Sequence, residues 1–505
     1  MPKWTSEQEE AIQKEGSNII VSAGAGSGKT AVLTARVIRK LENGIDINKL
    51  LILTFTNAAA AEMRERIRAA IKKNVNLHRQ LDLIDSAYIT TFDSFSQALV
   101  KKYHYLLGIN SNVSICDASV MYFKKNEILN NIFDELYAYP TKEFQDLIYD
   151  FCTKNDDDIK KYILKINDKL DLLYNKREYL ESYIEKFYND NFIDNRINEF
   201  VSLLRSKKQE ISSLIEKLSY EIDIEYIDKI YEILNSLISS NTYEDIKVSL
   251  DIKLPNLPKG SSELAKSIKE EISDCLKELK QISIYSDTAD IKNGILKTKN
   301  YVTAIIDIIK NIDERLNEFK NKNNIYEFND ISKMAIGILE ENDNVCIELK
   351  EYLNEILVDE YQDTSDLQEK FISLIENNNV YMVGDIKQSI YRFRNANPYI
   401  FKNKYDNYSL NNGGYKIDLN KNFRSRKETL DDINVIFNIV MDDFIGGADY
   451  KSSHQMIFGN NLYLENDMDS QNNNLEIYNY EYDKDFGYSK EEIECFTVAN
   501  DIKNM

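Results

Sequence analysis

Residues 23–30 form a glycine-rich segment that ends in a lysine and a threonine: Ala23, Gly24, Ala25, Gly26, Ser27, Gly28, Lys29 and Thr30. An apolar run (residues 19–21) precedes it, and a helical pattern (residues 31–41) follows it. A strand, a glycine-rich turn and a helix are the context of a phosphate-binding loop, in which backbone N–H groups surround a polyphosphate. Lys29 would reach the β- and γ-phosphates, and the Thr30 hydroxyl would bind Mg²⁺. The alternative is a flexible turn, and Ala23 stands where the motif has its first glycine, but both flanks favour a nucleoside triphosphate site.

A second segment, the apolar run 356–358, ends in two carboxylates. Asp359 would hold Mg²⁺ opposite Thr30, and Glu360 would orient and deprotonate an attacking water molecule. Many strands end in acidic residues at turns, so this pair alone is weak evidence. Together with the glycine-rich loop, it favours a hydrolase over a passive nucleotide binder.

The apolar runs that must position these groups predict an interrupted α/β domain. Strands are expected at residues 18–23, 50–56 and 87–91, each before a helical pattern, and again at 355–358 and 380–383. Between them, residues 116–324 are charged segments with apolar residues at helical spacing, such as Ile227, Ile230 and Leu234. We therefore predict an ATP-binding α/β domain over 1–115 and 325–404, with a helical insertion over 116–324.

The C-terminal part predicts the start of a second α/β domain over residues 405–505. Its expected elements are a strand at 415–419, helices to about residue 445, a polar loop at 465–474, a strand at 475–480 and a last helix. So few strands cannot make a closed sheet. The expectation is that the chain is part of a longer protein.

Composition limits the class of protein. The 505 residues suggest roughly three domains, and 43% of them are apolar. The first residues lack the basic and apolar regions of a signal peptide, and no apolar run approaches the ~20 residues of a membrane span. Five scattered cysteines and three distant histidines predict reduced thiols in the cytoplasm and no zinc site.

The charge is strongly acidic overall, at −21, but it is unevenly distributed. This balance argues against a non-specific nucleic-acid coat protein, whereas local basic strips fit a protein that follows a nucleic-acid backbone along one channel. The basic residues of a second group, on a helix at 64–73, are better explained as a solvated face. The main strip comprises Lys387, Arg392, Arg394, Lys402, Lys404, Lys416, Lys421, Arg424, Arg426 and Lys427.

Residues 359–364 (Asp-Glu-Tyr-Gln-Asp-Thr) resemble motif II of the UvrD/Rep group of superfamily 1 DNA helicases. Other segments resemble the remaining motifs in the family's order: 4–8 (Q motif), 53–63 (Ia), 91–95 (Ib), 326–330, 384–394 (III) and 422–425 (IV). Asp93 stands where motif Ib usually has a histidine. Within this group, residues 387–398 and 418–427 are most similar to the AddA-type chains of ATP-dependent helicase/nucleases.

The resemblance implies a fold of RecA-like domains and a role for each matched residue. Gln8 would read adenine, Gln362 and Gln388 would sense the γ-phosphate, and Arg424 would be an arginine finger supplied by the second domain. Core packing is the alternative for the aromatic residues, most seriously for Tyr391. The implied DNA contacts are made by Phe55, Thr56, Asn57, Thr91, Tyr391, Arg392 and Phe393.

The implied function is the motor portion of an ATP- and Mg²⁺-dependent 3′→5′ DNA helicase. The resemblance also implies pairing with the second, B-type chain of a helicase/nuclease and action on DNA ends in recombinational repair. Motifs V and VI and a nuclease domain are not among the 505 residues, so weak ATP hydrolysis and no nuclease activity are expected. Two alternatives remain. One is an ATP- and DNA-binding module without turnover; the other, an ATPase unrelated to nucleic acid, leaves the aromatic and basic residues at 391–394 unexplained.

Overall fold

The computed structural model describes residues 4–460, 477–479, 482 and 487–504. The chain divides into two compact units, one formed by 1–99 with 335–505 and the other by 100–334. The boundaries fall within helices α5 (Phe92–Lys102) and α15 (Phe328–Glu341). In the described part of the chain, no helix combines the length and the apolar character that crossing a bilayer requires.

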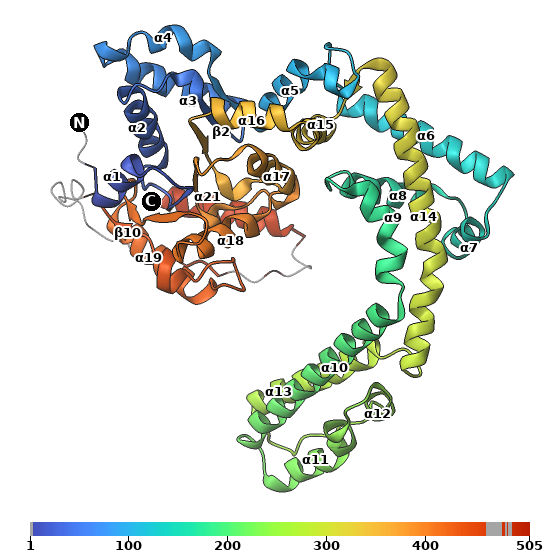
Figure 1. The fold of residues 1–505 in the computed structure, drawn as a ribbon. Coiled ribbons are helices and arrows are strands. Elements are labelled where there is room, and N and C mark those ends of the chain that lie inside the picture. Colours follow the sequence, from blue (N-terminus) through green and yellow to red (C-terminus); the bar gives the residue numbers. More distant parts are fainter. Residues whose placement is uncertain (1–3, 461–476, 480–481, 483–486, 505) are drawn as a thin grey trace. The chain divides into compact units, whose positions relative to one another are not determined.

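The first unit is built on a six-stranded parallel sheet in the order β3-β2-β6-β7-β1-β8 (Figure 1). The four central strands are buried along their whole length, as expected for a parallel sheet covered on both faces. The strands are β1 (Ile19–Ala23), β2 (Leu50–Thr54), β3 (Tyr88–Thr91), β6 (Glu355–Val358), β7 (Val380–Gly384) and β8 (Tyr415–Leu419).

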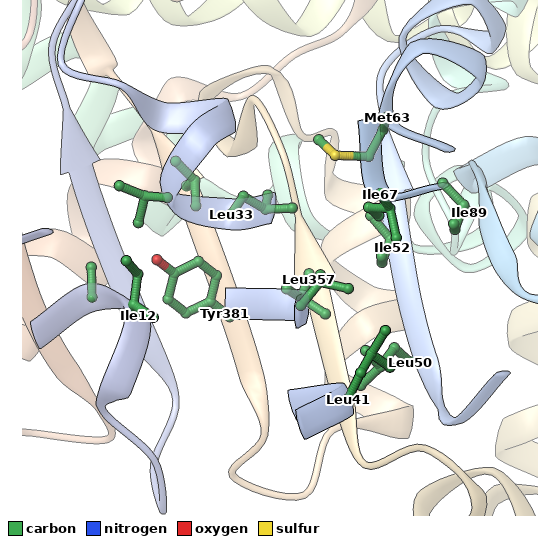
Figure 2. Close-up of a cluster of buried hydrophobic side chains, with 14 of the residues drawn as sticks. Ile12, Leu33, Leu41, Leu50, Ile52, Met63, Ile67, Ile89, Leu357 and Tyr381 are labelled. Carbon is green, nitrogen blue, oxygen red and sulfur yellow. The ribbon is translucent and has the colours of Figure 1, made fainter. Parts of the chain in front are cut away.

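The helices of this unit pack against the sheet through one apolar cluster. Figure 2 shows Leu33 and Leu41 of α2 in the same cluster as Ile52 of β2, Leu357 of β6 and Tyr381 of β7. The helices are α1 (Ser6–Gln13), α2 (Lys29–Glu42), α3 (Asn57–Lys72), α4 (Gln80–Leu83), α16 (Asp343–Tyr352), α17 (Asp366–Ile375), α18 (Pro398–Ser409), α19 (Lys427–Val440) and α21 (Lys490–Asn504).

The second unit is helical, as expected. Its two ends meet in a short parallel pair, β4 (Ser114–Ile115) with β5 (Ile325–Tyr326). One apolar core joins the helices from α6 to α9 with α14, and another joins those from α10 to α13 (Figure 1). The helices are α6 (Ala118–Ala138), α7 (Lys142–Phe151), α8 (Asp157–Leu170), α9 (Lys176–Phe187), α10 (Asp190–Ser219), α11 (Ile224–Ser239), α12 (Tyr243–Val248), α13 (Glu263–Ile282) and α14 (Thr288–Asn323).

The expectation that residues 415–419 open a second sheet is wrong. β8 pairs in parallel with β1 over its whole length, from Ile19 opposite Tyr415 to Ala23 opposite Leu419. The first sheet therefore continues past residue 404. A further short pair, β9 (Lys421–Asn422) with β10 (Ile457–Phe458), follows it. The loop expected at 465–474 lies outside the described residues, as does most of the strand expected at 475–480; residues 477–479 are not in a strand.

Candidate nucleotide and nucleic-acid site

The glycine-rich loop joins the end of β1 to the start of α2. Two of its glycines have left-handed backbones, with φ of 70° at Gly26 and 87° at Gly28, a conformation that side chains other than glycine rarely adopt. Space is short as well, because a Cβ at Gly26 would lie 2.7 Å from the Asn422 Oδ1 atom. Gly28 occupies the N-cap of α2 without a side chain to bond the first N–H groups. Those groups therefore remain available to an anion.

The acidic pair lies at the same edge of the sheet as the loop. Asp359 directly follows β6, and its backbone N–H donates to the Leu53 carbonyl of β2 at 2.9 Å. The Lys29 Nζ atom is 3.2 Å from the Glu360 Oε2 atom and 3.3 Å from the Gln388 Oε1 atom. Lys29 is 13% exposed in this arrangement. A lysine near the start of the chain thus meets two side chains that follow it by more than 300 residues.

Glutamines connect this point to the end of β7. The Gln362 Nε2 atom donates to Glu360 Oε2 at 2.8 Å, and the Gln362 Oε1 atom accepts from the backbone N–H of Asp385 at 3.0 Å. Gln388 Nε2 donates to the Asp385 carboxylate at 2.7 Å. Lys29, Glu360 and both glutamines therefore form one hydrogen-bonded network.

The electrostatics of the acidic residues suit a site for a cation. Burial and, less strongly, the neighbouring Glu360 charge raise the pKa of Asp359 to about 6, although Lys29 opposes the shift. Burial also raises the pKa of Asp363 to about 6, again with a contribution from Glu360. Glu360 itself has a left-handed backbone (φ 51°), which is strained for a residue with a side chain. A divalent cation would stabilise the ionised form of such carboxylates.

The segment after β8 packs directly on the glycine-rich loop. The Asn422 Nδ2 atom donates to the Ala25 carbonyl at 2.8 Å, and the Phe423 backbone N–H donates to the Gly26 carbonyl at 2.9 Å. Arg424 follows at once, with its Cβ atom beside Gly26. The expectation that a second domain supplies Arg424 is therefore wrong, because the strand that leads to it belongs to the first sheet.

Gln8 lies under the loop on α1. Its Oε1 atom accepts from the Thr5 backbone N–H in a capping box, and its Nε2 atom donates to the Ser27 carbonyl at 3.0 Å. The side chain is buried. Gln8 thus supports the loop in this structure, and contact with a nucleotide base would require one of these bonds to open.

Three aromatic rings gather beyond Gln388. Phe55 and Tyr391 are stacked, with ring centroids 5.0 Å apart, and Phe393 lies 5.8 Å from Tyr391. Phe393 is 72% exposed, whereas the other two are half-buried. The Arg394 guanidinium lies 5.2–6.0 Å from all three ring centroids. Sequence reasoning counted Arg394 only as a charge; its signal was the alternation of basic and aromatic residues at 391–394.

The other expected contact residues differ in their surroundings. Thr56 caps α3, since its Oγ1 atom accepts from the Ala59 backbone N–H at 3.1 Å. Asn57 and Arg392 are exposed. Thr91 is buried and donates to the Ser94 hydroxyl at 2.9 Å. Of these four residues, Thr91 is therefore the one withdrawn from the surface.

A comparison with known families decides what the sheet, the loop and the acidic pair belong to. The UvrD/REP helicase N-terminal domain matches residues 4–409. The chain belongs to this family. The match includes the site residues described above as far as Arg394, and the segment after β8 that carries Arg424 lies beyond it.

Relatives of this UvrD/REP chain share one name, which is that of the A chain of an ATP-dependent helicase/nuclease. The Clostridium beijerinckii protein is 34% identical over 90% of this chain and 41% of its own length. A Thermoanaerobacter protein is 36% identical over the same shares, and that of Clostridioides difficile is 32% identical over 92% and 41%. The chain thus spans about two fifths of the length of these relatives.

The loop of this UvrD/REP domain fits a bound triphosphate. Within the described residues, the buried Ser27 hydroxyl has no hydrogen-bond partner. The left-handed glycines leave room for close approach to the backbone, and Lys29 supplies a positive charge beside open helix N–H groups. Thr30, the second residue of α2, and Asp359 offer the oxygen ligands that Mg²⁺ prefers.

Proposed function

We propose that the chain is the motor portion of an ATP-dependent DNA helicase, in which ATP hydrolysis with Mg²⁺ drives movement along single-stranded DNA. The observation that supports it best is the convergence of Lys29, Glu360 and Gln388 within 3.3 Å beside the glycine-rich loop. A passive nucleotide site has no need of a carboxylate at this position. A hydrolase needs one to activate water.

Each of these residues would have a distinct task. The loop N–H groups and Lys29 would bind the β- and γ-phosphates, and Thr30 with Asp359 would hold Mg²⁺. When bound, Mg²⁺ supplies electrostatic stabilisation of the charge on the transferring phosphoryl group. Glu360 would take the proton from the attacking water. Because Lys29 now contacts Glu360, ATP binding would draw the ammonium towards phosphate and free the carboxylate for this step.

The connection between Gln388 and the rings supports coupling to DNA. Gln388 contacts Lys29, and only two residues separate it from Tyr391, which stacks on Phe55. A change in the Gln388 contact when phosphate is bound or lost would therefore shift the ring cluster. Aromatic faces stack on bases of any sequence, which suits a protein that moves along a strand.

The finer parts of the proposal rest on the family and on the names of the relatives. They are 3′→5′ polarity, RecA-like domains, a helicase/nuclease assembly with a B-type chain, and action on duplex ends in double-strand break repair. We also propose the division into an ATP-binding domain, a helical insertion at 116–324 and a second α/β domain. The pairing of β8 moves the end of the first domain from 404 to at least Leu419.

The test of this function is ATP hydrolysis with and without single-stranded DNA, for the chain and for Lys29→Ala. We expect stimulation by DNA and its loss in the variant, because no other side chain offers an ammonium at the Glu360 carboxylate among the described residues. Lys72→Ala, on an exposed position at the end of α3, is the matched control and should hydrolyse ATP normally. Tight ATP and DNA binding without turnover in the unmodified chain would instead support the non-catalytic module.

The exposed ring makes a separate prediction. Phe393→Ala should weaken binding of single-stranded DNA roughly tenfold, because stacking on one base contributes about 1–3 kcal/mol. ATP affinity should not change, since the ring contacts of Phe393 are with Tyr391 and Arg394. Fluorescence titrations with a labelled oligonucleotide and with an ATP analogue measure the two. Phe444→Ala, on another exposed ring, is the control. Equal loss of both affinities would mean that Phe393 supports the fold.

A further inference from the structure

Arg36, in the middle of α2, is 1% exposed and makes a buried fork-like contact. Its Nε atom lies 3.1 Å from the Glu355 Oε2 atom, and its Nη2 atom lies 2.5 Å from Glu355 Oε1. Both side chains are almost fully buried. This two-point geometry fixes direction as well as distance, which a single contact does not.

The same guanidinium touches two more elements. Its Nη1 atom donates to the Ala11 carbonyl at 2.9 Å, near the end of α1, and its central carbon lies 4.2 Å from the centre of the Tyr381 ring on β7. Arg36 therefore contacts α1, β6 and β7 while belonging to α2. Lys40 completes the charge balance around it, at 3.5 Å from Glu355 and 3.0 Å from Glu15.

Each of these four elements carries a residue of the nucleotide site. α1 carries Gln8, α2 starts with Lys29, β6 leads into Asp359 and Glu360, and β7 leads into Asp385. Arg36 follows Lys29 by two turns of α2, and Glu355 is the first residue of the strand that ends beside Glu360. The pair thus joins the two elements whose ends bring Lys29 and Glu360 together.

Stability alone does not explain an arginine at this position. Replacing a buried ion pair by well-packed apolar side chains is often neutral or stabilising, because both charges lose their hydration on burial. What apolar contacts do not supply is a fixed register between helix and strand, and the planar guanidinium does.

We propose that Arg36 and Glu355 are positioning residues that set the alignment of Lys29 with Glu360. This inference rests on the proposed function, since it assigns the alignment to ATP binding and hydrolysis. The competing explanation is that the pair only stabilises the fold. The two explanations differ in what an apolar replacement of both side chains does.

The experiment compares Arg36→Met, Glu355→Leu and the double variant with the unmodified chain. We expect each single substitution to lower the melting temperature, because it leaves one buried charge alone. In the double variant the melting temperature should return to within a few degrees of the unmodified chain. Its kcat for ATP should nevertheless fall about 100-fold, with a smaller change in KM, because a displacement of ~1 Å at a reacting group can have that effect.

A matched control is the buried pair of Lys176 and Asp313 in the helical unit, 2.5 Å apart. Lys176→Met with Asp313→Leu should leave kcat unchanged. If the Arg36/Glu355 double variant recovers both melting temperature and kcat, the positioning role is wrong. If it does not fold, Arg36→Lys decides: this variant keeps the charge without the fork, and unchanged kcat would overturn the proposal.

Failure of the proposed function gives a different result. If the unmodified chain hydrolyses no ATP, the motor proposal fails, and the pair is judged by titration with a fluorescent ATP analogue. A folded double variant that binds the analogue at least tenfold more weakly then supports the positioning role. Unchanged affinity overturns it.

Discussion

Glu360→Gln should reduce kcat for ATP hydrolysis by about 10²–10⁴-fold, the usual contribution of a general base. Glutamine has nearly the same shape but does not accept a proton from water at neutral pH. ATP affinity should be retained or increase, because Lys29 loses the carboxylate that now holds it at 3.2 Å and is free to contact phosphate. Steady-state kinetics and titration with an ATP analogue measure the two effects.

The control for this substitution is Asp366→Asn, at an exposed carboxylate in the first turn of α17 that bonds the Asn397 side chain. It removes a charge from the same stretch of chain without touching the site, so kcat should stay near that of the unmodified chain. A Glu360→Gln variant that keeps kcat within about threefold would exclude Glu360 as the base. Another group, such as Asp363, would then have to take the proton.

The parts of the site that the sequence predicted are those set by local pattern. Short apolar runs that end in glycine or acidic residues predicted β1, β6 and β7 nearly to the residue. The carboxyl ends of parallel strands share one edge of a sheet. The approach of Lys29 to Glu360 therefore followed once both runs were recognised as strands of one sheet.

The parts that the sequence missed depend on long-range pairing. The alternating pattern at 415–419 predicts a half-buried strand, but periodicity does not say which sheet the strand joins. Arg36 was missed for a related reason, because a basic residue in an amphipathic helix usually faces water. Only the meeting with Glu355, more than 300 residues later, accounts for its burial.

The placement of β8 changes what is expected of Arg424. If this arginine reached ATP only when a second domain closed, its effect would depend on DNA and on that domain. The segment that carries it instead hydrogen-bonds the glycine-rich loop, and its Cβ atom lies beside Gly26. We therefore expect Arg424 to act whenever ATP is bound, with or without DNA.

Arg424→Ala should lower kcat about 10³-fold or more, the range found for arginine fingers, both in the presence and in the absence of single-stranded DNA. Arg424→Lys should recover only part of this loss, because an ammonium does not bind two phosphate oxygens at once. Arg426→Ala, two residues further on, is the control and should hydrolyse ATP at nearly the normal rate. If Arg424→Ala slows only the DNA-stimulated reaction, the finger depends on domain closure after all. If neither reaction slows, Arg424 is a packing residue of the loop, and the charge that stabilises the transition state has to come from elsewhere in the protein.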